Sequence, residues 1–255
     1  MAEGEAGGAD EAPIGVIGGS GFARFLDGAE EVAVTTPYGE PSAPVALGEV
    51  GSRPVAFLPR HGAGHVHPPH GVPNRANVWA LRELGVRRVL APFAAGSLQP
   101  SIEPGDLVVV DQFVDRTAGR ADTFHDRFTD GPQHASMADP YDAGLRAAVV
   151  AGAERLGFRA HPSGTVVVIQ GPRFSTRAES RWYAAQGWEL VNMTQYPEAA
   201  LAREAGLAYA GIGLVTDRDA GTHEGDAVHQ DEVFSAFERL LDRLRALLVD
   251  VIPRL

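Results

Sequence analysis

The 255-residue chain contains no cysteine, and its 22 basic residues are all arginine, because no lysine occurs in the sequence. The lack of cysteine excludes disulfides, thiolate nucleophiles and cysteine-ligated zinc. The lack of lysine excludes Schiff-base chemistry and the lysine of a nucleotide-binding P-loop. No apolar run reaches 18 residues, so the sequence predicts no transmembrane helix.

The formal net charge of -11 disfavours nucleic acids and anionic membranes as partners, so an anionic substrate would need a local basic site. The length, with 44% hydrophobic and 22% charged residues, fits a globular protein of one large α/β domain or two small ones. Residues 1–12 are acidic, rich in Gly and Ala, and lack the basic region of a signal peptide. We therefore expect a disordered tail over 1–12, one folded domain over 13–255, and a cytoplasmic enzyme.

Short apolar strands and amphipathic helices alternate along the chain. The predicted strands begin at 14 and lie at 55–58, 89–93, 107–110, 165–169, just before Asn192, and at 207–215. The predicted helices lie at 74–85, with Asn74 as its cap, at 141–156, 177–185 and 231–251, and near Pro197. This order predicts an α/β fold, a three-layer domain whose central mixed sheet is flanked by helices. The polar stretch 111–140 is expected to be a loop that forms a lid or an interface, or is disordered.

A glycine turn, Gly18-Gly19-Ser20-Gly21, follows the first predicted strand. Its glycines do not match the G-x-G-x-x-G spacing of a dinucleotide site. A small phosphate-binding loop with Ser20 as a donor fits better, and a simple tight turn is the alternative.

Arg60 and His61 follow the second predicted strand. A guanidinium binds phosphate bidentately, so Arg60 is a candidate anion clamp. His65, His67 and His70 follow closely, but no HExxH motif and no acidic residue accompanies them, so no metal site is predicted.

The stretch from Asn192 to Glu198 indicates a strand end followed by a helix N-terminus near Pro197. Exposed amides at such a junction favour an anion. Met193 can cover an apolar ligand face and Thr194 can donate to an oxyanion. The alternative is a structural junction with a core Met and a capping Thr.

Asp217 and Asp219 follow the last predicted strand with i, i+2 spacing, so in an extended segment they point the same way. Such a pair can hold one pKa high, which suits a general acid, although either residue can instead cap a helix. Phe174, at another strand end, can stack on a flat ligand or belong to the core.

Taken together, these blocks resemble the trimeric nucleoside phosphorylases, and among them the methylthioadenosine phosphorylase branch. The matching blocks run in order from about 14 to 252: 18–21, 60–62, 77–81, 96–98, 104–106, 111–116, 171–175, 192–194, 197–198 and 216–219.

The resemblance implies phosphorolysis, in which phosphate attacks the anomeric carbon of a purine nucleoside. It implies no metal and no cofactor, phosphate being a co-substrate. Phosphate would be held by Ser20, Arg60, His61, the Ala94 amide and Thr194. Met193 would contact the ribose, Phe174 and Ser175 the base, Asp217 the purine N7, and Asp219 the 6-amino group. His134 would reach into a neighbouring subunit of a homotrimer.

Two positions depart from the pattern of this branch. Phe93 stands where a Thr near phosphate is usual, which weakens phosphate binding if the family uses that hydroxyl. Gln230, beside His229, lies near the position that separates 5′-hydroxyl-accepting from methylthio-accepting members, and Val233 is assigned to substrate as well. A polar group there disfavours a methylthio tail.

We therefore expect a phosphorylase of 5′-methylthioadenosine. A general purine nucleoside phosphorylase is the alternative within the family. From other classes, a nucleoside hydrolase would usually need a calcium site of clustered aspartates, which this sequence lacks, and a non-catalytic adenine-nucleoside-binding protein would show no turnover.

Overall fold

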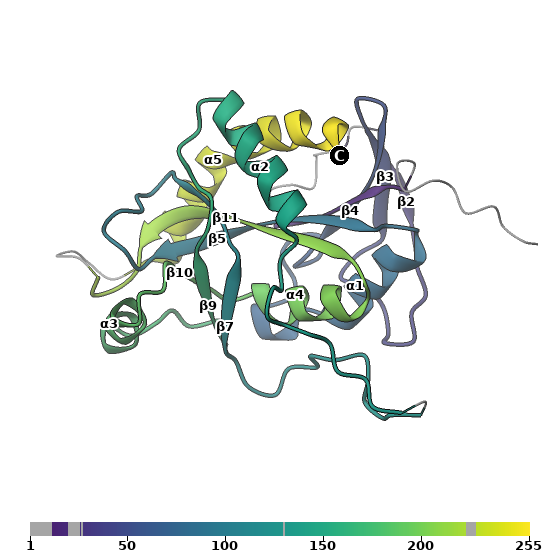
Figure 1. Cartoon of the computed structure of the whole chain (residues 1–255), viewed down its shortest axis with the longest axis horizontal. Helices are drawn as coiled ribbons and strands as arrows, with labels where there is room; N and C mark the ends of the chain where they lie inside the picture. Colours follow the sequence, from purple (N-terminus) through teal and green to yellow (C-terminus); the bar gives the residue numbers. More distant parts are fainter. Residues whose placement is uncertain (1–11, 20–25, 27, 130, 223–227) are drawn as a thin grey trace, which may run out of the picture.

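The computed structural model describes residues 12–19, 26, 28–129, 131–222 and 228–255. In this part of the chain, eleven strands form one mixed sheet and five α-helices pack around it (Figure 1). The strands are β1 Ile14–Gly18, β2 Glu30–Val32, β3 Val45–Val50, β4 Arg53–Pro59, β5 Arg88–Ser97, β6 Leu107–Val109, β7 Gln112–Arg116, β8 Ala160–His161, β9 Thr165–Ile169, β10 Leu190–Asn192 and β11 Ala208–Arg218. The α-helices are α1 Asn74–Glu83, α2 Ala143–Arg155, α3 Arg177–Ala185, α4 Gln195–Glu204 and α5 Gln230–Val251.

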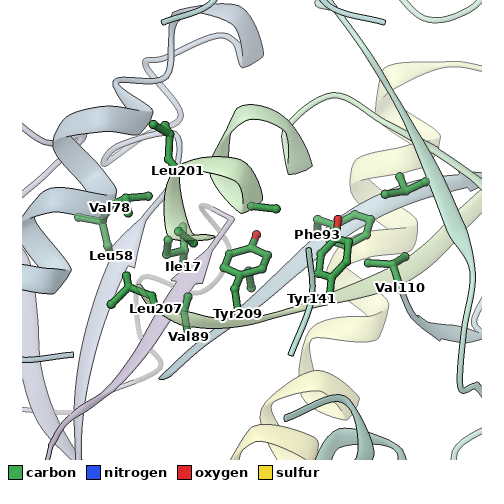
Figure 2. Close-up of a cluster of buried hydrophobic side chains, with 14 of the residues drawn as sticks. Ile17, Leu58, Val78, Val89, Phe93, Val110, Tyr141, Leu201, Leu207 and Tyr209 are labelled. Atoms are coloured by element: carbon green, nitrogen blue, oxygen red, sulfur yellow. The ribbon is translucent and has the colours of Figure 1, made fainter. Parts of the chain in front are cut away.

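The three layers confirm the predicted fold class. Helices α2 and α5 cover one face of the sheet, and α1 and α4 cover the other (Figure 1). Successive residues of β5 face opposite sides of the sheet. Val89 and Phe93 belong to the buried cluster that Figure 2 shows, and Leu90 belongs to the cluster beneath α2 and α5. The predicted tail lies almost wholly outside the described residues and stays a prediction.

Strand β5 is the branch point of the sheet. It pairs in parallel with β1 on one side and with β11 along its whole length on the other, and its last residues pair antiparallel with β10. Strand β4 is parallel to β1, so the carboxyl ends of β1, β4, β5 and β11 meet at one edge of the sheet. The antiparallel β10 runs back along β5 from Ser97, which brings Asn192 to the same place. Ligands bind at such an edge of an open α/β sheet.

Some predicted boundaries were wrong. Asn74 does not cap α1: it is the first helical residue, Pro73 precedes it, and its Nδ2 donates to the Val72 carbonyl. Helix α2 begins after Asp142, whose carboxylate accepts the Leu145 amide as an N-cap, and so starts later than predicted.

Strands were also longer or more numerous than predicted. Strand β7 lies inside the predicted loop 111–140 and pairs in parallel with β9. It is partly exposed and polar, as suits the edge of a sheet, and so lacks the apolar signal of a buried strand. Strand β5 extends to Ser97 and β11 to Arg218, so Asp217 belongs to a strand and not to a following turn.

Candidate active site

One cavity of about 770 Å³ opens beside the carboxyl ends of β4, β5 and β11. Twelve of the thirteen predicted site residues that the structure describes line it: Arg60, His61, Phe93, Ala94, Phe174, Ser175, Met193, Thr194, Asp217, Asp219, Gln230 and Val233. Ser20 lies outside the described residues, although its neighbour Gly19 is part of the cavity wall. The fold therefore gathers residues that lie up to 173 positions apart in the sequence.

His134 does not line this cavity. It is exposed, in the long segment between β7 and α2, and its ring packs edge-on against Phe128 at 5.5 Å. Phe128 is itself 50% exposed. The predicted role of His134 in a neighbouring subunit's site is not tested by a single chain.

Strand β5 sets the order of the groups along the cavity. The Pro92 carbonyl accepts from Arg60 Nη1 at 3.0 Å, and the Ala94 carbonyl accepts from Asn192 Nδ2 at 2.9 Å. At Gly96, a Cβ atom would lie 3.1 Å from Asp217 Oδ2, so the missing side chain makes room for the carboxylates. The four-residue step from Pro92 to Gly96 spans about 13 Å in a strand. The guanidinium and the carboxylate pair therefore stand toward opposite ends of one strand segment.

Arg60 is held by an extensive buried network. Its Nε and Nη2 donate to the two oxygens of Glu198 at 2.7 and 2.8 Å, and Nη2 also donates to the Ile17 carbonyl at 3.1 Å. With the bond to Pro92, protein groups take four of its five N–H bonds, so a bidentate clamp on phosphate, as the sequence predicted, would require a rearrangement. Burial acts to lower the pKa of Arg60, but the Glu198 carboxylate outweighs it and the pKa is raised.

Glu198 is the functional candidate that sequence reasoning missed. The exposed fractions of the Arg60 and Glu198 side chains are 2% and 0%, and the two residues are 138 positions apart. A long-range pair of this kind leaves no local pattern in the sequence. A buried Glu one turn into an apolar helix was the available signal, because such a residue is almost never unpaired.

His61 follows Arg60 and is neutral at neutral pH. Burial lowers its pKa to about 4, with a smaller contribution from the charge of Arg60. Its Nδ1 lies 2.9 Å from the His67 carbonyl, and its ring stacks on His65 at 4.2 Å. Since the His67 carbonyl accepts, Nδ1 carries the proton and Nε2 is the acceptor.

The junction of β10 and α4 differs from the predicted anion site. Asn192 Oδ1 accepts the amides of Thr194 and Gln195 at 2.7 and 2.8 Å, so those two amides are not available to a ligand. The Thr194 hydroxyl donates to the same oxygen only at the long distance of 3.4 Å, so it can turn toward a ligand at the cavity wall.

Asp217 and Asp219 form a carboxylate pair at the cavity wall. Asp219 is 2% exposed, and burial, together with the nearby charge of Asp217, raises its pKa to about 6. The Ser180 hydroxyl donates to Asp219 Oδ2 at 2.5 Å, which opposes the rise. Thr216 Oγ1 lies 2.7 Å from Asp217 Oδ1, and a bulge in β11 between Val215 and Asp217 turns this part of the strand.

The segment between β9 and α3 presents Phe174 and Ser175 to the cavity. A capping box fixes it: Glu179 accepts the Thr176 amide at 2.7 Å, Thr176 accepts the Glu179 amide, and Arg173 pairs with Glu179 at 2.7 Å. Ser175 Oγ is buried and lies near Asp219, where the hydroxyl acts to lower the pKa of that carboxyl group. A ligand that reaches this hydroxyl would compete with Asp219 for it.

Helix α5 and the segment after β4 form the other wall. Gln230 and Val233 line the cavity as predicted, while His229 does not. Phe234 and His65, which sequence reasoning did not assign to the site, meet edge-on at 5.8 Å across this wall. Phe234 is 45% exposed. The sequence shows an apolar residue near the start of a helix, but it does not show that the fold leaves this residue exposed.

Phe93 contributes to the core as well as to the cavity. Its ring belongs to the buried cluster of Figure 2, and it is 2% exposed. The position therefore supplies no hydroxyl to phosphate, and any contact with phosphate is made by its backbone.

The described ranges contain neither a metal-binding cluster nor a membrane-spanning helix. No group of three His, Asp or Glu residues there could hold a metal ion. None of the helices in those ranges combines the length and the apolar character needed to cross a bilayer.

The three-layer fold, with its cavity at the carboxyl edge of the sheet, is a nucleoside phosphorylase fold, which the chain shares with solved methylthioadenosine phosphorylases. In agreement with it, the Phosphorylase superfamily matches residues 13–253, and the chain belongs to that family.

Two relatives and one solved structure show which members of the family this chain is similar to. The chain is 56% identical to the S-methyl-5'-thioadenosine phosphorylase of Mycobacterium tuberculosis over 242 residues, which cover 94% of this chain and 89% of the relative. It is 53% identical to a purine nucleoside phosphorylase of Streptomyces coelicolor over 251 residues, covering 96% and 90%. Among solved structures, it is similar to a mutant adenosine/methylthioadenosine phosphorylase of Schistosoma mansoni in complex with methylthioadenosine, with a TM-score of 0.88, 40% identity, and coverage of 95% and 91%.

Proposed function

We propose that this chain catalyses the phosphorolysis of 5′-methylthioadenosine. A phosphate oxygen forms a bond to the anomeric carbon as the bond to the purine breaks, which gives adenine and 5-methylthioribose 1-phosphate. The relatives named above support this assignment. The observation that carries it is the order along β5, where Arg60 meets Pro92 and the carboxylates meet Gly96, about 13 Å apart. That span accommodates a nucleoside with phosphate beneath its ribose.

At the phosphate end, Arg60, the Thr194 hydroxyl, neutral His61 and the backbone at Phe93 and Ala94 hold the nucleophile, together with Ser20. Met193 packs against the ribose. Positioning of this kind supplies a large part of the rate enhancement of an enzyme. The transition state has oxocarbenium character, as in glycoside cleavage, so the negative charge of phosphate stabilises it.

At the base end, Asp217 in its protonated form donates a proton or a hydrogen bond to the purine N7 as the bond to the ribose breaks. Asp219, with a pKa of about 6, is mostly ionised at neutral pH and accepts from the 6-amino group. Ser175 completes the contact, and Phe174 stacks on the base. General acid help of this kind contributes about 10²–10⁴ in rate.

A general purine nucleoside phosphorylase is the second candidate. Gln230 is exposed at the cavity wall, where a polar side chain suits a 5′-hydroxyl, and a relative at 53% identity carries the name purine nucleoside phosphorylase. Val233, Phe234 and Phe237 on the same helix favour the methylthio group instead.

The proposal includes a homotrimer in which His134 completes the site of a neighbouring subunit and Gln230 and Val233 contact the 5′ end. It is supported by the exposure of His134 and Phe128, neither of which lines the cavity of its own chain. The requirement for phosphate alone, without a metal or other cofactor, is part of the same proposal.

The test is to incubate the purified protein with 5′-methylthioadenosine, adenosine or inosine, with and without phosphate, and to follow the free base. Adenine release that depends on phosphate and is fastest from methylthioadenosine is expected. Fastest release from adenosine or inosine would move the assignment to the second candidate. Release without phosphate would indicate a hydrolase, and binding without release would indicate a non-catalytic binding protein.

A further inference from the structure

The positive charge of Arg60 is balanced inside the protein by the carboxylate of Glu198. Glu198 binds it through both oxygens, and the two side chains are 2% and 0% exposed, so water screens this pair very little. Among the described residues that line the cavity, the other basic side chains are His61 and His65, and His61 is neutral. The arginine therefore offers phosphate an N–H donor without a net positive charge behind it.

We propose that Glu198 sets the charge of the phosphate subsite, so that bound phosphate keeps its negative charge for the anomeric carbon. This inference rests on the phosphorolysis proposed above. A free guanidinium would bind phosphate more tightly but would neutralise the nucleophile and withdraw stabilisation from the oxocarbenium-like transition state. Since only interactions that are stronger in the transition state than in the ground state raise the rate, tighter phosphate binding of that kind lowers turnover.

A second buried group adjusts the same carboxylate. The Tyr209 hydroxyl donates to Glu198 Oε1 at 2.6 Å, and Gln195 Nε2 donates to the Tyr209 oxygen at 3.1 Å. One bond further, the Tyr141 hydroxyl donates to Gln195 Oε1 at 3.2 Å. The bond from Tyr209 draws part of the carboxylate's charge away from Arg60. Removing this hydrogen bond strengthens the ion pair between Glu198 and Arg60 and makes the phosphate subsite more negative.

The two substitutions therefore act in opposite directions. Glu198→Gln keeps the shape and removes the charge, so the dissociation constant for inorganic phosphate should fall by about tenfold, or about 1.4 kcal/mol, while kcat falls, because the buried guanidinium then attracts phosphate with its full charge and little screening. Tyr209→Phe should raise the dissociation constant for phosphate by about threefold and leave kcat at saturating phosphate unchanged or higher. Tyr141→Phe is the matched control, since it removes a buried hydroxyl that reaches Glu198 only through Gln195 and Tyr209, and it should change both values less than twofold.

Phosphate binding is measured by calorimetry on the whole protein without nucleoside, and turnover is measured with methylthioadenosine. If Glu198 only holds Arg60 in place, both Glu198→Gln and Tyr209→Phe will weaken phosphate binding and lower kcat, which overturns the inference. If Glu198→Gln does not fold, the two tyrosine variants decide: a lower kcat in Tyr209→Phe, or equal effects in both, also overturns it. A parent protein that releases no base in the presence of phosphate instead refutes the proposed function, which is a separate outcome.

Discussion

Ionised, buried Asp219 destabilises the folded state, and the substitution Asp219→Asn should remove this destabilisation. Its carboxyl group is 2% exposed and its pKa is raised to about 6, first by burial and then by the charge of Asp217. The difference between about 6 and the ordinary value of 3.8 corresponds to about 3 kcal/mol at 1.4 kcal/mol for each pH unit. Above pH 7 the folded state holds the ionised form and bears this whole cost.

The sign of the pH dependence follows from the raised pKa. As the pH falls through 6, the folded state takes up a proton before the unfolded state does, so the cost declines; it is about half as large at pH 5 and disappears below 3.8. Asp219→Asn has the same shape and no charge. We expect the variant to be about 2 kcal/mol more stable than the parent at pH 8, because the weaker hydrogen bond from Ser180 offsets about 1 kcal/mol. At pH 5 this gain in the free energy of unfolding should be smaller by at least about 1 kcal/mol.

The assay is equilibrium unfolding in urea at pH 8 and pH 5, without phosphate or nucleoside. Asp106→Asn is the matched control, because Asp106 is also buried but pairs with His161 at 2.9 Å and with Arg159 at 3.4 Å. That variant should be less stable than the parent at pH 8. If Asp219→Asn is destabilised at pH 8, or gains equally at both pH values, the reasoning is refuted. The same variant should lose its preference for 6-aminopurines, since the amide Oδ1 still accepts from a 6-amino group but Nδ2 can now donate to a 6-oxo group.

Three further substitutions test the site. Asp217→Asn should lower kcat for phosphorolysis by at least about tenfold in steady-state assays, because the leaving purine loses its proton donor, and an unchanged kcat would exclude that role. Gly96→Ala should lower kcat by about tenfold with folding retained by circular dichroism, because the new Cβ meets Asp217 Oδ2 and Val191 Cγ1 at 3.1 Å; normal activity would show that the carboxylates adjust freely. Gln230→Val should raise the ratio of kcat/KM for methylthioadenosine over adenosine by about fivefold, and a falling ratio would remove Gln230 from the 5′ contact.

Much of the site could be predicted from strand ends. The alternation of apolar runs and polar turns located Arg60 and Asp217, because the carboxyl ends of parallel strands meet at one edge of a sheet. Thr194 reaches the same cavity because β10 runs antiparallel to β5. The size of the pKa shift of Asp219 could not be predicted, since it depends on how fully the fold buries the carboxyl group.

Other features depend on contacts that no local pattern encodes. Glu198 and Arg60 are 138 positions apart, and nothing near either residue points to the other. Asn192 was expected only to mark a strand end, yet its side chain accepts the two amides that had been assigned to an anion. Strand β7 escaped prediction because an edge strand keeps polar residues that read locally as a loop.

The branched position of β5 has a consequence for how this enzyme can change. Pro92, Ala94 and Gly96 lie in a strand that is hydrogen-bonded to three others, so a substitution there shifts site groups that the sheet holds in place. Gln230 and Phe234 lie at the exposed start of a helix, where a side chain can be exchanged at little cost to folding. New substrate preferences should therefore arise first on α5, and laboratory selection for other nucleosides should begin with a library on that helix and leave β5 intact.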